Sequence, residues 1–148
     1  MKLLHLKPEA PRYCLLAAAG LMWSAVGVML CGIAWKWLSS SAAMLRTAAS
    51  VMTGIAGAWI VYRFGFSKIA LKNIERLSQL PERACFFAFQ AWKSYVIIAV
   101  MILLGITLRH SAIPRYYLAA LYITIGGALF LSSILYHVRL WRILCPKP

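Results

Sequence analysis

Apolar and polar residues alternate in blocks along the 148-residue chain, and the blocks leave four apolar stretches. The stretches cover approximately 13–34, 47–66, 85–108 and 116–136, close to the roughly 20 residues that a helix needs to cross the hydrocarbon core of a bilayer. Helices are expected because lipid offers no hydrogen-bond partners to an exposed backbone. The pattern therefore predicts an all-α polytopic membrane protein, with four transmembrane helices in a bundle that forms a single domain over residues 1–148. It leaves the exact start of the third helix open.

A different pattern fills the connection between the second and third stretches, in "SKIALKNIERLSQL" (67–80). Lys68, Lys72 and Arg76 recur every fourth residue, while apolar residues fall towards the other side of a helix that Pro81 would end. This spacing predicts an amphipathic cytoplasmic segment between helices 2 and 3. Two arrangements agree with it: a helix lying in the plane of the inner leaflet, or an extension of the second crossing into the cytoplasm.

Small residues form stripes along the first two crossings. Gly20, Ser24 and Gly27 follow one another at alternating spacings of four and three in the first crossing, and Gly54 and Gly57 continue a similar stripe in the second. Such stripes let helix backbones approach closely, which matters in lipid because no hydrophobic force drives helices together there. We expect these residues at helix–helix contacts, either within one chain or between copies.

Composition supports the membrane class. Hydrophobic residues make up 63% of the chain and charged residues 13%, whereas soluble domains contain roughly 45–50% apolar and 25% charged residues. A soluble domain of this length could not bury so much apolar surface. Lipid as the surrounding solvent removes that difficulty.

Basic residues flank the apolar stretches and set the expected orientation. The chain has 16 Lys and Arg but three acidic residues, for a formal net charge of +13. Twelve basic residues flank the side that holds both termini and the central connection, and the other four are Lys36, Arg46, Arg109 and Arg115. By the positive-inside rule we expect a multi-pass protein of the bacterial inner (cytoplasmic) membrane with both termini cytoplasmic. Anionic lipids of the inner leaflet are expected partners, and nucleic acid is not.

Groups that carry catalysis or hold cofactors are scarce and scattered. Glu9, Glu75 and Glu82 all lie outside the predicted crossings, which argues against transporters that use an intramembrane carboxylate and against acid–base hydrolases. The cysteines form no C-x-x-C pair. The histidines are expected at different positions across the membrane, so they cannot converge on a metal or a haem. We therefore expect no catalytic residue, no metal and no cofactor.

Five residues are candidate contacts for an anion or another substrate: Gln90, Lys93, Arg109, His110 and Arg115. If the third crossing begins as the pattern suggests, Lys93 lies about a third of the way through it, where a charged side chain is costly unless it lines a wet cavity or reaches the head groups. At the short outer connection stand Arg109, His110 and Arg115, with no acidic residue nearby in the sequence. A plain membrane edge also explains them, and whether Lys93 faces a cavity or the lipid interface stays open.

Two similar segments raise the question of a duplication. "PEAPRYCLLA" (8–17) precedes the first crossing and "PERACFFA" (81–88) precedes the third, and both contain Pro-Glu followed by Arg, one residue and Cys. A tandem duplication of a two-helix unit would give two halves of the same orientation. The alternative is chance similarity between apolar segments.

The run "AWKSYVIIAVMILLGITLRHSAIPRYYLAALYITIGGALFLSS" (91–133), together with "LMWSAVGVML" (21–30), resembles a family of small uncharacterised bacterial four-helix membrane proteins. The resemblance covers most of the chain. It implies no activity, cofactor or binding residue.

The absent chemistry favours a non-catalytic integral membrane protein, not an enzyme, that acts as a homo-oligomer or as a subunit of a larger membrane assembly. Four short crossings leave little room for a substrate cavity, and the small-residue stripes suit close association. The alternative is a minimal transporter or channel for an anion or an amphipathic molecule, using Lys93, Arg109 and Arg115. The sequence names no substrate.

Overall fold

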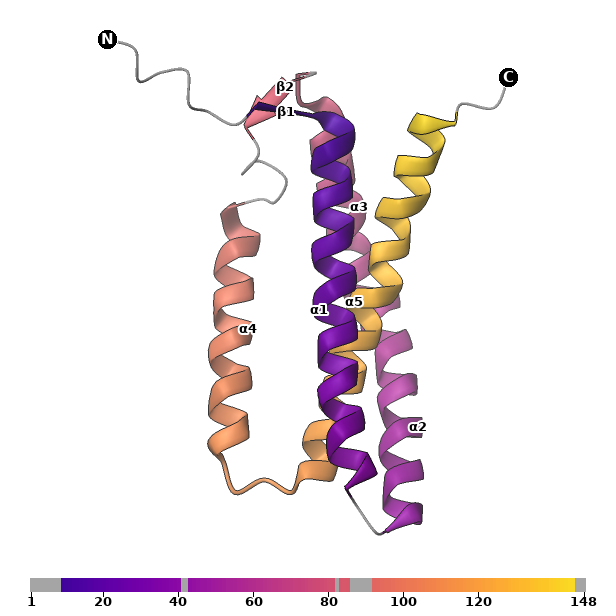
Figure 1. Ribbon diagram of the computed structural model, residues 1–148, viewed down its shortest axis with the longest axis vertical. Helices are drawn as coiled ribbons and strands as arrows, with labels where there is room; N and C mark the ends of the chain where they lie inside the picture. Colours follow the sequence, from indigo (N-terminus) through magenta and orange to yellow (C-terminus); the bar gives the residue numbers. More distant parts are fainter. Residues whose placement is uncertain (1–8, 41–42, 82, 86–91, 146–148) are drawn as a thin grey trace.

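A computed structural model of the chain describes residues 9–40, 43–81, 83–85 and 92–145 (Figure 1). The fold is all-α, and the described residues add to the helices one ribbon of two short strands. In chain order the elements are β1 (Glu9–Pro11), α1 (Arg12–Ser39), α2 (Met44–Val61), the π-helical turn η1 (Tyr62–Phe66), α3 (Ser67–Gln79), β2 (Arg83–Cys85), α4 (Trp92–His110) and α5 (Arg115–Leu144).

The helices run roughly parallel to one long axis (Figure 1). One end of the molecule, where α1 begins and α5 ends, is called the terminal end below. The opposite end, where α1 gives way to α2 and α4 to α5, is called the turn end. Pro114 stands directly before α5 in an extended conformation, with ψ of 135°. Its missing N–H costs nothing there, because the first turn of a helix leaves its N–H groups unpaired.

Three helices of the described residues are long and apolar enough to cross a membrane: Arg12–Ser39, Met44–Gln79 and Arg115–Leu144. They correspond to the first, second and fourth predicted crossings. The third, predicted over 85–108, corresponds to α4, which contributes the shorter apolar helix Ala99–His110. Cys85 lies in β2 instead of a helix, and residues 86–91 lie outside the described part of the chain.

The helix of the second predicted crossing continues without a break from α2 through η1 into α3. Val61 and Ser67, on either side of η1, both have α-helical dihedral angles. The resulting helix of 36 residues is roughly 54 Å long at 1.5 Å per residue, well beyond the ~30 Å hydrocarbon core. The apolar face of α3 is buried with residues of α1 and α5, which include Leu15 and Tyr136. Of the two arrangements left open by the sequence, α3 is therefore the extension of the second crossing.

Helix α5 is the centre of the fold, because both α1 and α2 pack along it. One apolar cluster lies towards the terminal end, where the Trp23 ring is 5.9 Å from the ring of Phe66 and 5.7 Å from that of Tyr136. A second cluster lies towards the turn end, where the Trp37 and Tyr122 rings are 5.1 Å apart. The continuous helix formed by α2, η1 and α3 is called the α2–α3 rod below. The two clusters hold α1, this rod and α5 together as a three-helix core.

Both small-residue stripes meet α5 of the same chain. A Cβ atom added to Gly27 would lie 2.8 Å from the carbonyl oxygen of Gly126, so the two backbones are in direct contact. Cβ atoms added to Gly54 and Gly57 would lie 2.7 Å from the side chains of Ile123 and Thr124. The close approach that these stripes allow is thus used between helices of one chain.

The β1–β2 ribbon joins the two similar segments of the sequence. It is antiparallel, with Glu9 opposite Cys85 and Pro11 opposite Arg83. Leu80 is extended at ψ of 152°, as expected of a residue that precedes a proline. The ribbon brings the two segments together. In two equivalent halves, α4 would contact α2 and α3 as extensively as α1 contacts α5, but the described residues show no such contact. The duplication stays a prediction.

Candidate functional site

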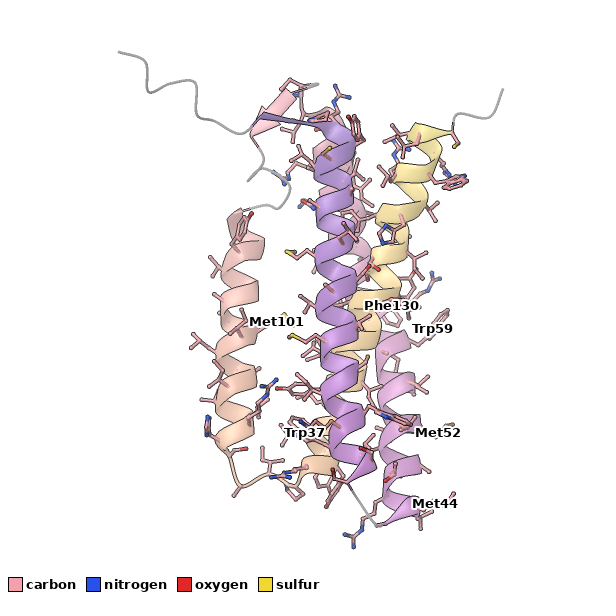
Figure 2. The ribbon with its side chains drawn as sticks, viewed as in Figure 1. Trp37, Met44, Met52, Trp59, Met101 and Phe130 are labelled. Carbon is pink, nitrogen blue, oxygen red and sulfur yellow. The ribbon has the colours of Figure 1, made fainter. Side chains whose placement is uncertain are left out.

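A groove of about 390 Å³ lies between α4 on one side and α1 and α5 on the other. Phe66 and Ile69 contribute to its lining from the α2–α3 rod, and the rest of the lining is mostly apolar. Met101 lies on the side of α4 that faces α1, and its side chain points into the space between them (Figure 2). Together with Met22 and Met29 of α1 it gives the groove a flexible wall, since unbranched methionine side chains adapt to different shapes.

Arg109 is the charged residue of the groove lining. Its Nε donates a hydrogen bond to Tyr122 Oη at 3.1 Å, and its guanidinium carbon lies 5.6 Å from the centre of the Tyr122 ring. Tyr122 Oη in turn donates to the carbonyl oxygen of Gly105 at 3.3 Å. These contacts fix one edge of the guanidinium group. Its terminal nitrogens have no carboxylate partner among the described residues, so they remain donors for a ligand.

The turn end as a whole is positively charged. His110 and Arg115, the last residue of α4 and the first of α5, are exposed there, but neither lines the groove. Arg46 lies with its guanidinium 5.9 Å from the ring of Tyr116. Glu9 belongs to the ribbon at the terminal end, and the exposed Glu75 lies in α3. Among the candidate anion contacts at the turn end, Arg109 is the one that the fold places in a groove.

The expected pair of Gln90 and Lys93 falls largely outside the described residues. Gln90 as a whole and the side chain of Lys93 lie outside the part of the chain that the structure describes. The backbone of Lys93 is described and is the second residue of α4, because the helix begins at Trp92. Lys93 thus lies in the first turn of α4, and its role as a substrate contact stays a prediction.

A polar network links α3 to α5 near the terminal end. Asn73 Nδ2 donates to Tyr136 Oη at 3.1 Å, and Arg76 donates from Nε and Nη2 to Asn73 Oδ1 at 3.3 and 3.1 Å. Asn73 and Tyr136 are both buried. The sequence offered a signal that was missed, since Asn73 is a polar residue among the apolar positions Ala70, Ile74 and Leu77 of the buried face.

A second polar cluster links α1 to α5 and tests the idea of an enzyme. Ser24 Oγ lies 2.8 Å from Ser133 Oγ and 3.2 Å from His137 Nε2. A serine beside a histidine can be a nucleophile with its base. Here no carboxylate among the described residues orients the histidine. Both serines also lie inside helices, where backbone N–H groups are already bonded and cannot form an oxyanion hole. The cluster is suited to joining helices.

No group of three or more His, Cys, Asp or Glu side chains within the described ranges is placed to bind a metal ion. Among the described residues, the features that bear on function are the size of the groove and its one charged residue, Arg109. Comparison with protein-family models, with curated proteins and with solved structures gives no match to this chain.

Proposed function

We propose that the chain is a non-catalytic integral membrane protein that binds an amphipathic anion in the groove beside α4. The observation that carries the proposal is a cation with free donors, Arg109, in a groove that is otherwise mostly apolar. A molecule with an alkyl chain and an anionic head matches both parts. This is the ligand class of the alternative function that the sequence left open.

The exposed surface supports a place in lipid. Leu21, Met52 and Leu103 are each more than 60% exposed, and they come from three different helices. Met52 and Trp59 project from α2 away from the other helices (Figure 2). Apolar side chains exposed on so many helices would form large hydrophobic patches in water, which soluble monomers avoid. In a bilayer the same side chains contact lipid tails at no cost.

The size of the groove decides how much of an amphiphile it holds. A dry cavity of about 150 Å³ is enough for benzene, a molecule of six carbon atoms. By that ratio, the roughly 390 Å³ between α4 and the core accommodates roughly 15 carbon atoms. This is the size of one alkyl chain. A crossing helix of another protein, about 10 Å in diameter, is too bulky for it.

Charge decides which head group suits the groove. Arginine presents its donors in a planar fork that matches carboxylate and phosphate oxygens. Tyr122 occupies Nε of Arg109 and leaves the two terminal nitrogens for the ligand. A hydrogen bond to a charged group contributes about 1.5–3 kcal/mol. The alkyl chain contributes the larger share, at about 0.8 kcal/mol for each buried CH₂ group, if its alternative is water.

Assembly into a homo-oligomer or a larger complex is a second proposal. It draws support from α4, on which Val96, Val100 and Leu103 are all more than half exposed and do not line the groove. The small-residue stripes no longer argue for it, because α5 of the same chain occupies them. Native mass spectra of the detergent-solubilised protein report the number of chains per particle and so measure the oligomeric state directly.

We expect the turn end to face outwards and the terminal end to face the cytoplasm, because the terminal side carries most of the basic residues. In a variant whose native cysteines are replaced by serine, a cysteine at Ser111 should react with a membrane-impermeant maleimide in intact cells. A cysteine at Gln79 should react after the cells are opened. Both positions are exposed. The reverse labelling pattern would contradict this orientation.

Replacing Arg109 by glutamine should weaken the binding of dodecyl phosphate by about tenfold or more, the equivalent of about 1.4 kcal/mol. Arg115→Gln is the matched control, since it removes the same charge from the same end but does not line the groove. Native mass spectrometry of the detergent-solubilised protein, titrated with the ligand, gives both affinities. Dodecanol should bind more weakly than dodecyl phosphate to the wild type. Equal losses in the two variants would mean that the charge of the turn end acts diffusely, and would contradict the proposal.

A further inference from the structure

A second hollow, of about 430 Å³, lies between α3 and α5 at the opposite end from Arg109. Its apolar part is formed by Leu71 and Ile74 of α3 and by Leu135 and Val138 of α5. Its polar part is formed by Arg139 and Arg142 of α5 and by Glu75 and Ser78 of α3. The hollow is therefore also amphipathic, but it carries two cations.

The two arginines are arranged to act together. They are three residues apart on α5, a spacing that places side chains on the same side of a helix. Both are exposed, and neither forms a hydrogen bond or an ion pair with another described residue. Glu75 is the acidic residue of the lining, so the two arginines outnumber it. Ser78 Oγ already donates to the carbonyl oxygen of Glu75 at 2.7 Å.

The position along α5 corresponds to the head-group layer of a bilayer. The predicted fourth crossing ends at residue 136, and Arg139 and Arg142 lie three and six residues beyond it. At 1.5 Å per residue these distances are roughly 5 and 9 Å. The head-group region on each side of the hydrocarbon core is about 5–7 Å thick. By this reckoning Arg139 lies within the head-group layer and Arg142 at its outer edge, whereas Leu135 lies at the end of the predicted crossing, beside the acyl chains.

We propose that this hollow binds one anionic phospholipid of the leaflet at the terminal end. The phosphate accepts hydrogen bonds from Arg139 and Arg142, and an acyl chain runs along Leu135 and Leu71 towards the bilayer centre. A free phosphate would use the arginines but leave the apolar wall without a partner. Basic pockets between membrane helices on the cytoplasmic side suit anionic head groups for these reasons. Helices α3 and α5 contribute to both this hollow and the groove beside α4, but no residue lines both, so the two sites can succeed or fail independently.

The test compares two double variants that remove the same charge from the same pair of packed helices, α3 and α5. Arg139→Gln/Arg142→Gln changes the hollow, whereas Lys68→Gln/Lys72→Gln changes exposed lysines of α3 that do not line it. Native mass spectra of each protein are recorded with phosphatidylglycerol and with phosphatidylcholine. The wild type should retain one phosphatidylglycerol in preference to phosphatidylcholine. The arginine variant should lose affinity for it about tenfold or more, and the lysine variant about twofold or less.

Three results would overturn the proposal. Equal losses in the two double variants would show diffuse attraction to the basic surface. Displacement of phosphatidylglycerol by millimolar inorganic phosphate would show a site for a soluble anion. Equal retention of the two phospholipids would show that charge is not recognised. Circular dichroism confirms that each variant is folded, and Arg139→Lys/Arg142→Lys, which keeps both charges, should recover part of the lost affinity.

Discussion

Replacing Gly27 by alanine should lower the free energy of unfolding by about 1–3 kcal/mol, the typical cost of overpacking. The added Cβ would lie 2.8 Å from the carbonyl oxygen of Gly126 and 3.0 Å from the backbone nitrogen of Phe130. Backbone atoms cannot rotate away as a side-chain tip can, so α1 and α5 must separate along their contact. Gly126→Ala should have a similar effect, because its Cβ would meet the carbonyl oxygen of Gly27, also at 2.8 Å.

Gly32→Ala in the same helix is the control. A Cβ there would have no atom within 4 Å, and alanine favours a helix over glycine by about 0.5–1 kcal/mol. We expect this variant to be as stable as the wild type or more stable. The measurement is thermal unfolding in detergent, followed by circular dichroism. Equal stability of the Gly27 and Gly32 variants would mean that α1 and α5 do not touch at Gly27.

Filling the groove beside α4 should weaken ligand binding by removing the room for the alkyl chain. Val26 of α1 lines the groove, so an indole ring in its place takes up the volume intended for the alkyl chain. We expect Val26→Trp to weaken dodecyl phosphate binding by at least about tenfold, since overpacking a filled site costs about 1–3 kcal/mol. Unlike Arg109→Gln, it should weaken dodecanol and dodecyl phosphate alike, because it removes room and not charge.

Val28→Trp is the matched control for this experiment. Val28 lies two residues further along α1, is 58% exposed and does not line the groove. The same side chain at this position should face lipid and leave the affinity unchanged. Native mass spectrometry compares the two variants under identical conditions. A loss of binding in both, or in neither, would contradict the assignment of the groove as the ligand site.

The helices of the core could be predicted from apolar blocks alone, because a lipid-exposed helix and a buried membrane helix are both apolar. The same property explains what could not be predicted. An amphipathic segment such as 67–80 has one apolar face whether lipid or protein covers it, so its pattern fits both arrangements. The structure covers that face with α1 and α5. The small-residue stripes likewise predicted close contacts but not the partner helix.

The apolar pattern predicts helices that follow the two similar segments, 8–17 and 81–88, but the prolines of these segments favour extended backbone. Pro11 adopts ψ of 152° before α1, and Pro81 follows an extended Leu80. Both prolines favour extended backbone around them, which is the conformation that pairs as β1 and β2. The first residue of the predicted third crossing, Cys85, therefore lies in a strand.

The candidate site was predictable in charge but not in shape. Arg109 and Arg115 look alike in the sequence, since both are basic residues beside a short connection. Only the packing of Tyr122 against α4 distinguishes them, because it directs Arg109 into the groove. In the sequence, Arg139 and Arg142 are two of the twelve basic residues on the side of the termini and bear on orientation alone. Their pairing with an apolar hollow depends on where α3 lies, and the sequence left that position open.

The π-helical turn η1 sets the rotational phase of the second crossing. Ala58 in α2 and Ala70 in α3 are both buried, yet twelve residues at about 100° each amount to three turns plus roughly 120°. An uninterrupted α-helix would thus direct the two alanines to different sides. A π turn closes its hydrogen bonds one residue later and absorbs one residue without advancing the phase, which leaves an offset of only about 20°. The continuous helix therefore keeps a single face against the core over its whole length. The π-helical turn at Tyr62–Phe66 is what places Ala58 and Ala70 on the same side of it.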